Sequence, residues 1–186
     1  MALLLLQIVL VSATSELFTA NKILNGISDG AGNIRWNHTT DEMKKITDET
    51  LAYCEETISK IEEVPDSERT FDNTIVPFAE LEANAVTVAS VFRIGHGSTE
   101  ELLAAQKDSL LRFEDFERNF SLDVRVFKAI SEFKKTAKKN EEWSKLTKED
   151  HIFVNKVLIG YMRAGVYLSE DVTEKLKQLD EETKAL

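Results

Sequence analysis

The sequence holds few residues of the kinds that break helices, cross-link a chain or form a structural metal site. Its 186 residues include 7 glycines, 2 prolines and 1 cysteine. So few glycines and prolines predict long secondary-structure elements joined by few turns. The single Cys54 excludes an intramolecular disulfide, and the sequence has no Cys/His spacing typical of a structural zinc site. Cys54 falls at a helical position near Ile58, which predicts a quiet, partly buried thiol, with a reactive thiol as the alternative.

The chain also lacks a surplus of basic residues. It has 23 Lys and Arg against 33 Asp and Glu, a formal net charge of -10. A protein that binds a phosphate backbone needs a Lys/Arg surface, so we expect no nucleic-acid partner. Hydrophobic residues make up 42% and charged residues 30%, which is typical of a globular domain long enough to bury a core.

No apolar run is long enough to predict a transmembrane span. Residues 3–11 form an apolar run far shorter than the roughly 20 residues that a spanning helix needs. Followed by Val11-Ser12-Ala13, this run is typical of a signal peptide, although the N-terminal amine is its only positive charge. An N-terminal helix or a wrongly chosen start would give the same residues. The sequence therefore leaves a cytoplasmic and a secreted location open.

A glycine-rich break, SDGAGN at residues 28–33, separates this first segment from the rest. It contains neither a Gly-x-Gly-x-x-Gly pattern nor a Gly-Lys-Ser/Thr pattern, so it does not predict a phosphate-binding loop. We interpret residues 1–33 as a leader and linker, and residues 34–186 as one helical domain.

Apolar residues in that domain recur every three or four positions, which predicts amphipathic helices. Gly165 is expected to end the fifth helix. Pro77 lies inside the second helical pattern, where it either marks the start of the helix or kinks it. With no alternating strand pattern, we predict an all-α antiparallel bundle of about six helices. The predicted starts are Thr39 with Glu42, Phe71, Ser98 with Glu101, Ser121, Thr147 with Asp150, and Ser169.

The same periodicity predicts which side chains face the core. Val124, Phe127, Ile130 and Ala137 are expected inward in the fourth helix, and Ile152, Val154, Leu158 and Met162 in the fifth. The sixth helix carries its apolar stripe on Val172, Leu176, Leu179, Thr183 and Leu186.

No residue cluster is arranged for catalysis. The three histidines, His38, His96 and His151, form no His-x-x-x-His pair. The carboxylate pairs at residues 55–56 and 62–63 fall on an acidic helix face, where we expect them to be solvated. We therefore predict no catalytic, cofactor-binding or metal-binding residue in this chain.

Several segments nevertheless resemble a known family. Ile34-Arg35-Trp36 and the helix after Thr39 are similar to the Leu-Arg-Trp segment and first helix of the thimet oligopeptidase, neurolysin and saccharolysin family of zinc metallopeptidases. Residues 113–116 and 123–127 resemble its Phe-Asp pair and the helix start that follows. Residues 158–168 resemble its Gly-Leu-His-Leu-Pro turn, with Ser169 in place of proline. The resemblance covers about residues 34–186.

The resemblance implies a helical domain that forms one wall of a peptide channel. The family's enzymes cut short peptides with a zinc ion held by a His-Glu-x-x-His helix in a later domain. That motif is absent from these 186 residues, so no catalytic or zinc-binding residue carries over. Zinc is then expected in the full-length family, and no cofactor in this chain.

Three interpretations stay open. The chain is a truncated or stand-alone relative of the peptidase domain, which binds a peptide, a partner or the missing catalytic domain, or associates with itself. Alternatively, it is the N-terminal part of an active zinc endopeptidase, or a secreted acidic helical binding protein with glycans at Asn37 or Asn119. The helical pattern continues to Leu186, which favours the truncated form among these interpretations.

Overall fold

A computed structural model describes residues 22–29, 33–94 and 99–168 of the protein. These residues form helices and a single isolated β-bridge between Ser28 and Ile34. The predicted all-α fold is therefore confirmed. The α-helices are α3 (Lys22–Gly26), α4 (Thr40–Glu63), α5 (Val76–Arg93), α6 (Glu100–Ser121), α7 (Val124–Lys139), α8 (Glu142–Lys145) and α9 (Lys148–Ala164).

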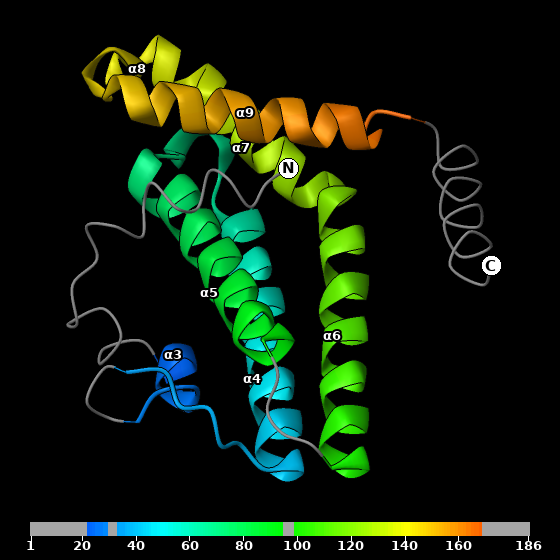
Figure 1. Ribbon diagram of the computed structural model, residues 1–186. Helices are drawn as coiled ribbons and strands as arrows, with labels where there is room; N and C mark the ends of the chain where they lie inside the picture. Colours follow the sequence, from blue (N-terminus) through cyan, green and yellow to red (C-terminus); the bar gives the residue numbers. More distant parts are fainter. Residues whose placement is uncertain (1–21, 30–32, 95–98, 169–186) are drawn as a thin grey trace.

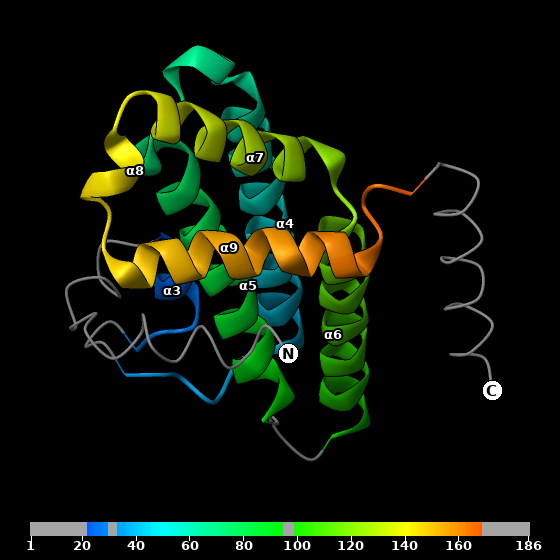
Figure 2. The ribbon, with the colours of Figure 1, turned by 90° about the horizontal axis from the view of Figure 1, so that it is seen from above.

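The three long helices α4, α5 and α6 lie side by side and alternate in direction (Figure 1). Helices α7 and α9 lie across the end of this unit at which α4 ends and α5 begins (Figure 2). The one-turn helix α8 joins α7 to α9 at the far side of that layer. The antiparallel bundle thus has a second helical layer over one end.

The predicted start of α4 is confirmed by a capping box. The Thr39 hydroxyl accepts a hydrogen bond from the Glu42 backbone N–H at 3.3 Å, and the Glu42 carboxylate accepts one from the Thr39 N–H at 2.8 Å. At the other end of α4, the buried Arg69 guanidinium donates to the carbonyl oxygens of Ile61 at 2.7 Å and Glu62 at 3.3 Å. Arg69 therefore satisfies carbonyl groups that the helix itself leaves unpaired.

Pro77 lies at the start of α5 rather than at a kink within it. A π-helical turn, η2 (Phe71–Ile75), precedes α5 and begins with its own capping box at Thr70 and Asn73. Because Pro77 has no N–H to donate into the preceding turn, it is tolerated in the first turn of a helix. The second helical pattern is thus a π turn followed by an α-helix.

Two predicted helix starts are wrong by one to three residues. Thr99 caps α6 by accepting from the Leu102 N–H at 3.3 Å, whereas the predicted Ser98 lies outside the described residues. Helix α6 runs through Ser121, and α7 begins only at Val124 after Asp123, whose side chain accepts from the Arg125 N–H. The Asp123 side chain offers a capping carboxylate, which the Ser121 prediction overlooked.

The inward face of α7 also differs from the prediction at its first turn. Ile130 and Ala137 are buried and Phe127 is half-buried, as expected, but Val124 is 60% exposed. The face that packs on the core is carried instead by residues at helical spacing that begin at the third residue of α7. These residues are Val126, Ala129, Ile130, Phe133 and Ala137.

Helix α9 has both predicted ends but only half of its predicted core face. Thr147 and Asp150 form a capping box, and Gly165 ends the helix in a left-handed conformation with φ of 99°. Val154 and Leu158 are buried, whereas Ile152 and Met162 are each 42% exposed, so their predicted inward positions are wrong. Tyr161 occupies the buried position that was assigned to Met162. The predicted sixth helix lies outside the described residues.

The core consists of two clusters of buried side chains. The larger cluster joins α4, α5, α7 and α9, and includes Phe78, Ile130 and Phe133. The smaller cluster lies where α3 packs against α4 and α5, and includes Ile27 and Phe92. Part of the segment that precedes residue 34 therefore packs into the helical domain. The division of the chain at residue 34 stays a prediction.

Within the described part of the chain, one helix is long and apolar enough to cross a membrane by length and composition, Phe71–Arg93. In the 18-residue stretch of this helix that has the highest mean hydropathy, 44% is buried inside the protein. Its buried residues, which include Phe78, Leu81 and Val88, belong to the two core clusters. The core helix of a bundle gives the same length and composition signal as a spanning helix.

Candidate functional site

An apolar stripe runs along the outer side of α9. Ile152 and Ile159 are 42% and 41% exposed, Met162 is 42% exposed, and Tyr167 just beyond the helix is 69% exposed. Residues 152, 159 and 163 are seven and four apart, so their side chains leave the helix in similar directions. The stripe lies opposite the core face, which carries Val154, Leu158 and Tyr161. We call Ile152, Lys156, Ile159, Met162, Arg163 and Tyr167 the α9 stripe.

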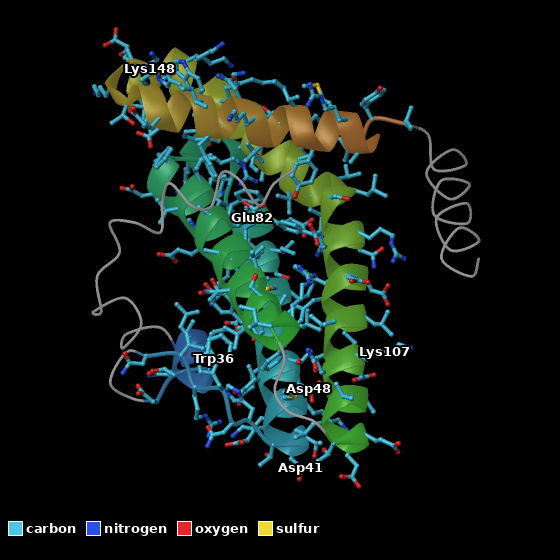
Figure 3. The ribbon with its side chains drawn as sticks, viewed as in Figure 1. Trp36, Asp41, Asp48, Glu82, Lys107 and Lys148 are labelled. Atoms are coloured by element: carbon cyan, nitrogen blue, oxygen red, sulfur yellow. The ribbon has the colours of Figure 1, made fainter. Side chains whose placement is uncertain are left out.

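The charge of the α9 stripe differs in sign from that of the whole chain. Between Asp150 and Glu170 the sequence contains no acidic residue, although the chain carries 33. Lys156 and Arg163 are exposed beside the apolar side chains. Lys148 lies at the far end of α9, where the helix begins (Figure 3). The helix therefore presents a cationic, apolar surface on an acidic protein.

Gly160 lies in the middle of the α9 stripe. A Cβ atom added there would have no heavy atom within 4 Å apart from its chain neighbours and the backbone of its own helix. The absent side chain leaves a flat place beside Lys156 and Arg163, which lie four residues before and three residues after it, where another backbone can approach closely. In geometry and charge, the α9 stripe thus suits a second helix with apolar and acidic side chains.

A second surface feature is a shallow depression of about 310 Å³ on α6. Its described lining comes from this one helix. Lys107 lies on the side that faces away from α4 and α5 (Figure 3), whereas Gln106 donates to the Phe92 carbonyl oxygen of α5 at 2.6 Å and Leu110 packs against the smaller core cluster. Leu103 and Leu111 are 52% and 47% exposed there. We call the six lining residues the α6 groove: Leu103, Gln106, Lys107, Leu110, Leu111 and Glu114.

A third feature is a polar junction beneath α9. Glu82 lies between α5 and α6 in Figure 3, and burial, with a further contribution from the charge of Glu117, raises its pKa to about 7. The Tyr161 ring packs against Phe120, with ring centroids 6.2 Å apart, and its buried hydroxyl has no hydrogen-bond partner among the residues that the structure describes. Burial, then the charges of Asp123 and Glu82, raise the Tyr161 pKa. A half-buried carboxyl that titrates near neutrality therefore lies close to a buried phenol.

The histidines that the structure describes have structural contacts. His38 is buried, with its Nε2 atom 3.3 Å from the Gly26 carbonyl oxygen and its ring edge-on to Phe92. His151 stacks on Trp143 at 4.5 Å between centroids, and its Nε2 atom lies 2.7 Å from the Trp143 carbonyl oxygen. His96 lies outside the described residues.

Cys54 and the acidic pairs occupy different environments. Cys54 is fully buried, where a partly buried thiol was expected, and burial raises its pKa to about 12. Both observations support the quiet thiol, whose low reactivity stays a prediction. The exposed Glu55 carboxylate forms an ion pair with Arg125 of α7 at 2.9 Å, and Glu62 lies 3.9 Å from the same guanidinium. These carboxylates connect α4 to α7 across the surface.

Among residues 22–29, 33–94 and 99–168, no group of three His, Cys, Asp or Glu side chains is placed to hold a metal ion. The structure does not bring the described histidines and acidic pairs together at one site. What the sequence interpretation missed is the α9 stripe. The sequence does contain a pattern that indicates this surface. Ile159 follows Ile152 by seven residues, so both lie on the side of the helix opposite Val154. No protein-family model matches the chain.

Proposed function

We propose that this chain is a non-catalytic helical binding module whose α9 stripe binds an acidic amphipathic helix of a peptide or partner protein. The observation that carries the proposal is the group of exposed apolar side chains on a helix without acidic residues after its first turn. Apolar burial would supply affinity, and Lys156 and Arg163 would favour acidic partners over basic ones.

The resemblance to the oligopeptidases suggests which partner helix the α9 stripe would bind. In that context, the module corresponds to a helical wall, and the partner helix belongs to the missing catalytic domain or to a peptide in its channel. The resembling segment at residues 158–168 includes part of the α9 stripe, which supports this placement. Zinc would then be held by the missing domain rather than by this chain.

The test is a fluorescence-anisotropy titration of the full chain with a labelled helical peptide of leucine and glutamate. The matched peptide carries lysine in place of every glutamate. We expect saturable binding of the acidic peptide and none of the basic one. Because burying an isoleucine side chain is worth about 1.5–3 kcal/mol, Ile159→Asp should weaken binding by about tenfold or more.

The matched control is Ile94→Asp, which changes a side chain that is 72% exposed at the opposite end of the bundle. It should leave the affinity unchanged. Lys156→Glu with Arg163→Glu should weaken binding of the acidic peptide and reduce its salt dependence. Equal binding of both peptides, or equal losses in Ile159→Asp and Ile94→Asp, would contradict the proposal, as would binding to vesicles of anionic lipid but not to the acidic peptide.

A further inference from the structure

The α6 groove has an exposed outer side, which carries Leu103, Lys107, Leu111 and Glu114. At its inner edge, Gln106 donates to the Phe92 carbonyl oxygen at 2.6 Å and the half-buried Leu110 packs against the smaller core cluster. Its centre is formed by Leu103, Lys107, Leu110 and Glu114, whose spacings of four, three and four place them in one line along the helix. The core-facing side chains of α6, Ser109 and Phe113, project from the other side of the helix. In this line two leucines alternate with one cation and one anion. A partner helix that places leucines and opposite charges at the matching positions would be selected over other helices.

The chain itself has a segment of matching length next to this face. Tyr161 of α9 packs against Phe120 at the C-terminal end of α6, so the chain leaves α9 beside that end of α6 (Figure 2). Residues 169–186 follow, and 18 residues of helix span about 27 Å. The 19 residues from Ser121 back to Leu103 span about 28 Å of α6, a similar length. A helix that returns along α6 in the antiparallel direction would therefore reach Leu103.

One antiparallel register pairs the side chains of the two segments at four positions. Leu179 meets Leu110, and Leu186 meets Leu103. In the same register Lys175 meets Glu114, and Glu182 meets Lys107. The parallel arrangement that places Val172 on Leu103 also places Leu179 on Leu110. It puts Leu176 beside Lys107 and Thr183 beside Glu114, so it pairs no opposite charges.

We propose that residues 169–186 form a helix that packs antiparallel along the α6 groove, with Leu179 on Leu110 and Leu186 on Leu103. This helix would extend the alternating unit of α4, α5 and α6 by a fourth member. Two leucine contacts supply the apolar burial, and the two opposite charge pairs select the register. The α6 groove and the α9 stripe are different surfaces, so the inference stands or falls separately from the proposed function.

Disulfide trapping in the full chain tests the register, with Cys54→Ala as the background. The pair Leu103→Cys and Leu186→Cys should oxidise to an intramolecular disulfide, with loss of both free thiols in the monomer, because only the antiparallel register brings these two positions within bridging distance. The pair Leu110→Cys and Leu179→Cys should also oxidise, since these positions meet in either register. The matched control pairs Leu110→Cys with Glu181→Cys, which lies on the opposite side of the predicted helix and should stay reduced. The parallel-register pair, Leu103→Cys with Val172→Cys, should also stay reduced.

A second measurement does not depend on disulfide geometry or on replacing Cys54. In the wild-type background, Leu110→Cys should react slowly with a maleimide, and adding Leu179→Asp should raise the rate several-fold, since the covering helix would be lost. Adding Glu181→Gln should leave the rate unchanged. A bridge in the parallel pair, a disulfide only between two copies, or a fast Leu110→Cys rate unaffected by Leu179→Asp would each overturn the proposal.

Discussion

At the scale of single residues, burial sets the proton affinity of Glu82 and Cys54. Neither side chain has an ion pair in the described part of the chain. Burial therefore disfavours the charged form of both groups, and Glu117 adds repulsion at Glu82. The consequences differ, because Glu82 titrates near neutral pH whereas Cys54 keeps its proton throughout the physiological range.

The raised pKa of Glu82 predicts that the protein loses stability as the pH rises. Its folded-state pKa of about 7 exceeds the ordinary value of 4.5, so the folded protein binds the proton more tightly than the unfolded chain does. The free energy of unfolding should therefore fall as the pH rises from about 4.5 to 7. Glu82→Gln should abolish this fall and be about 1–3 kcal/mol more stable than the wild type above pH ~8, with no difference at pH ~4.

Urea unfolding followed by circular dichroism across this range measures the effect. Glu80→Gln, which changes an exposed carboxylate two residues earlier in α5, is the matched control and should keep the wild-type pH dependence. If Glu82→Gln and the wild type show the same pH dependence, the junction beneath α9 does not titrate as described.

The burial of Cys54 predicts that its thiol reacts only when the protein opens. Its thiolate population is very small in the folded state, because burial raises the pKa to about 12, and the reagent has no access. An aromatic disulfide reagent should label the unfolded protein quickly and the folded protein at the rate of opening. Rapid labelling without denaturant would show that Cys54 is the reactive thiol of the alternative interpretation.

At the scale of single elements, helix ends were easier to predict than helix faces. The capping boxes at Thr39 and Thr147 and the left-handed Gly165 depend on local sequence alone, and all three are present. The exposed faces of Val124 and Ile152 depend on which neighbours each helix meets. An apolar period identifies an amphipathic helix, but α9 has apolar residues on two faces, and only tertiary packing decides which one is buried.

Two glycines in and after α9 predict opposite effects of the same substitution. Gly165→Ala should lower the free energy of unfolding by about 1 kcal/mol, because φ is 99° there and an L side chain is strained in that region. Gly160→Ala should raise it by about 0.5–1 kcal/mol, because Gly160 is helical and its added methyl meets nothing. Denaturant titrations check both, and a loss of stability in both variants would contradict the described end of α9.

At the scale of the whole molecule, the sequence predicted the fold class but not the surface that we propose as the binding site. Long periodic segments and few breakers were sufficient for an all-α bundle. The α9 stripe could not be identified as a surface from the sequence, because Met162 follows Leu158 by four residues and so fits the spacing of the core face, although it is exposed. The crossing layer of α7 and α9 also depends on non-local contacts that no local pattern records.

The chain is expected to have no peptidase activity. It lacks the His-Glu-x-x-His motif, so added zinc has no catalytic site of that type to occupy. The purified chain with added zinc should leave an internally quenched fluorogenic peptide uncut. Turnover that a chelator abolishes would contradict the non-catalytic interpretation and favour an unrecognised zinc site.

The central claim is that α9 carries the binding surface, and amide mapping by nuclear magnetic resonance tests it most directly. The isotope-labelled chain is titrated with the leucine–glutamate helical peptide, and the shift of each backbone amide is followed. We predict saturable shifts concentrated at residues 148–167, and their loss in Ile159→Asp with the rest of the spectrum preserved. Shifts concentrated on α4 or α6, or no shift at saturating peptide, would contradict the account.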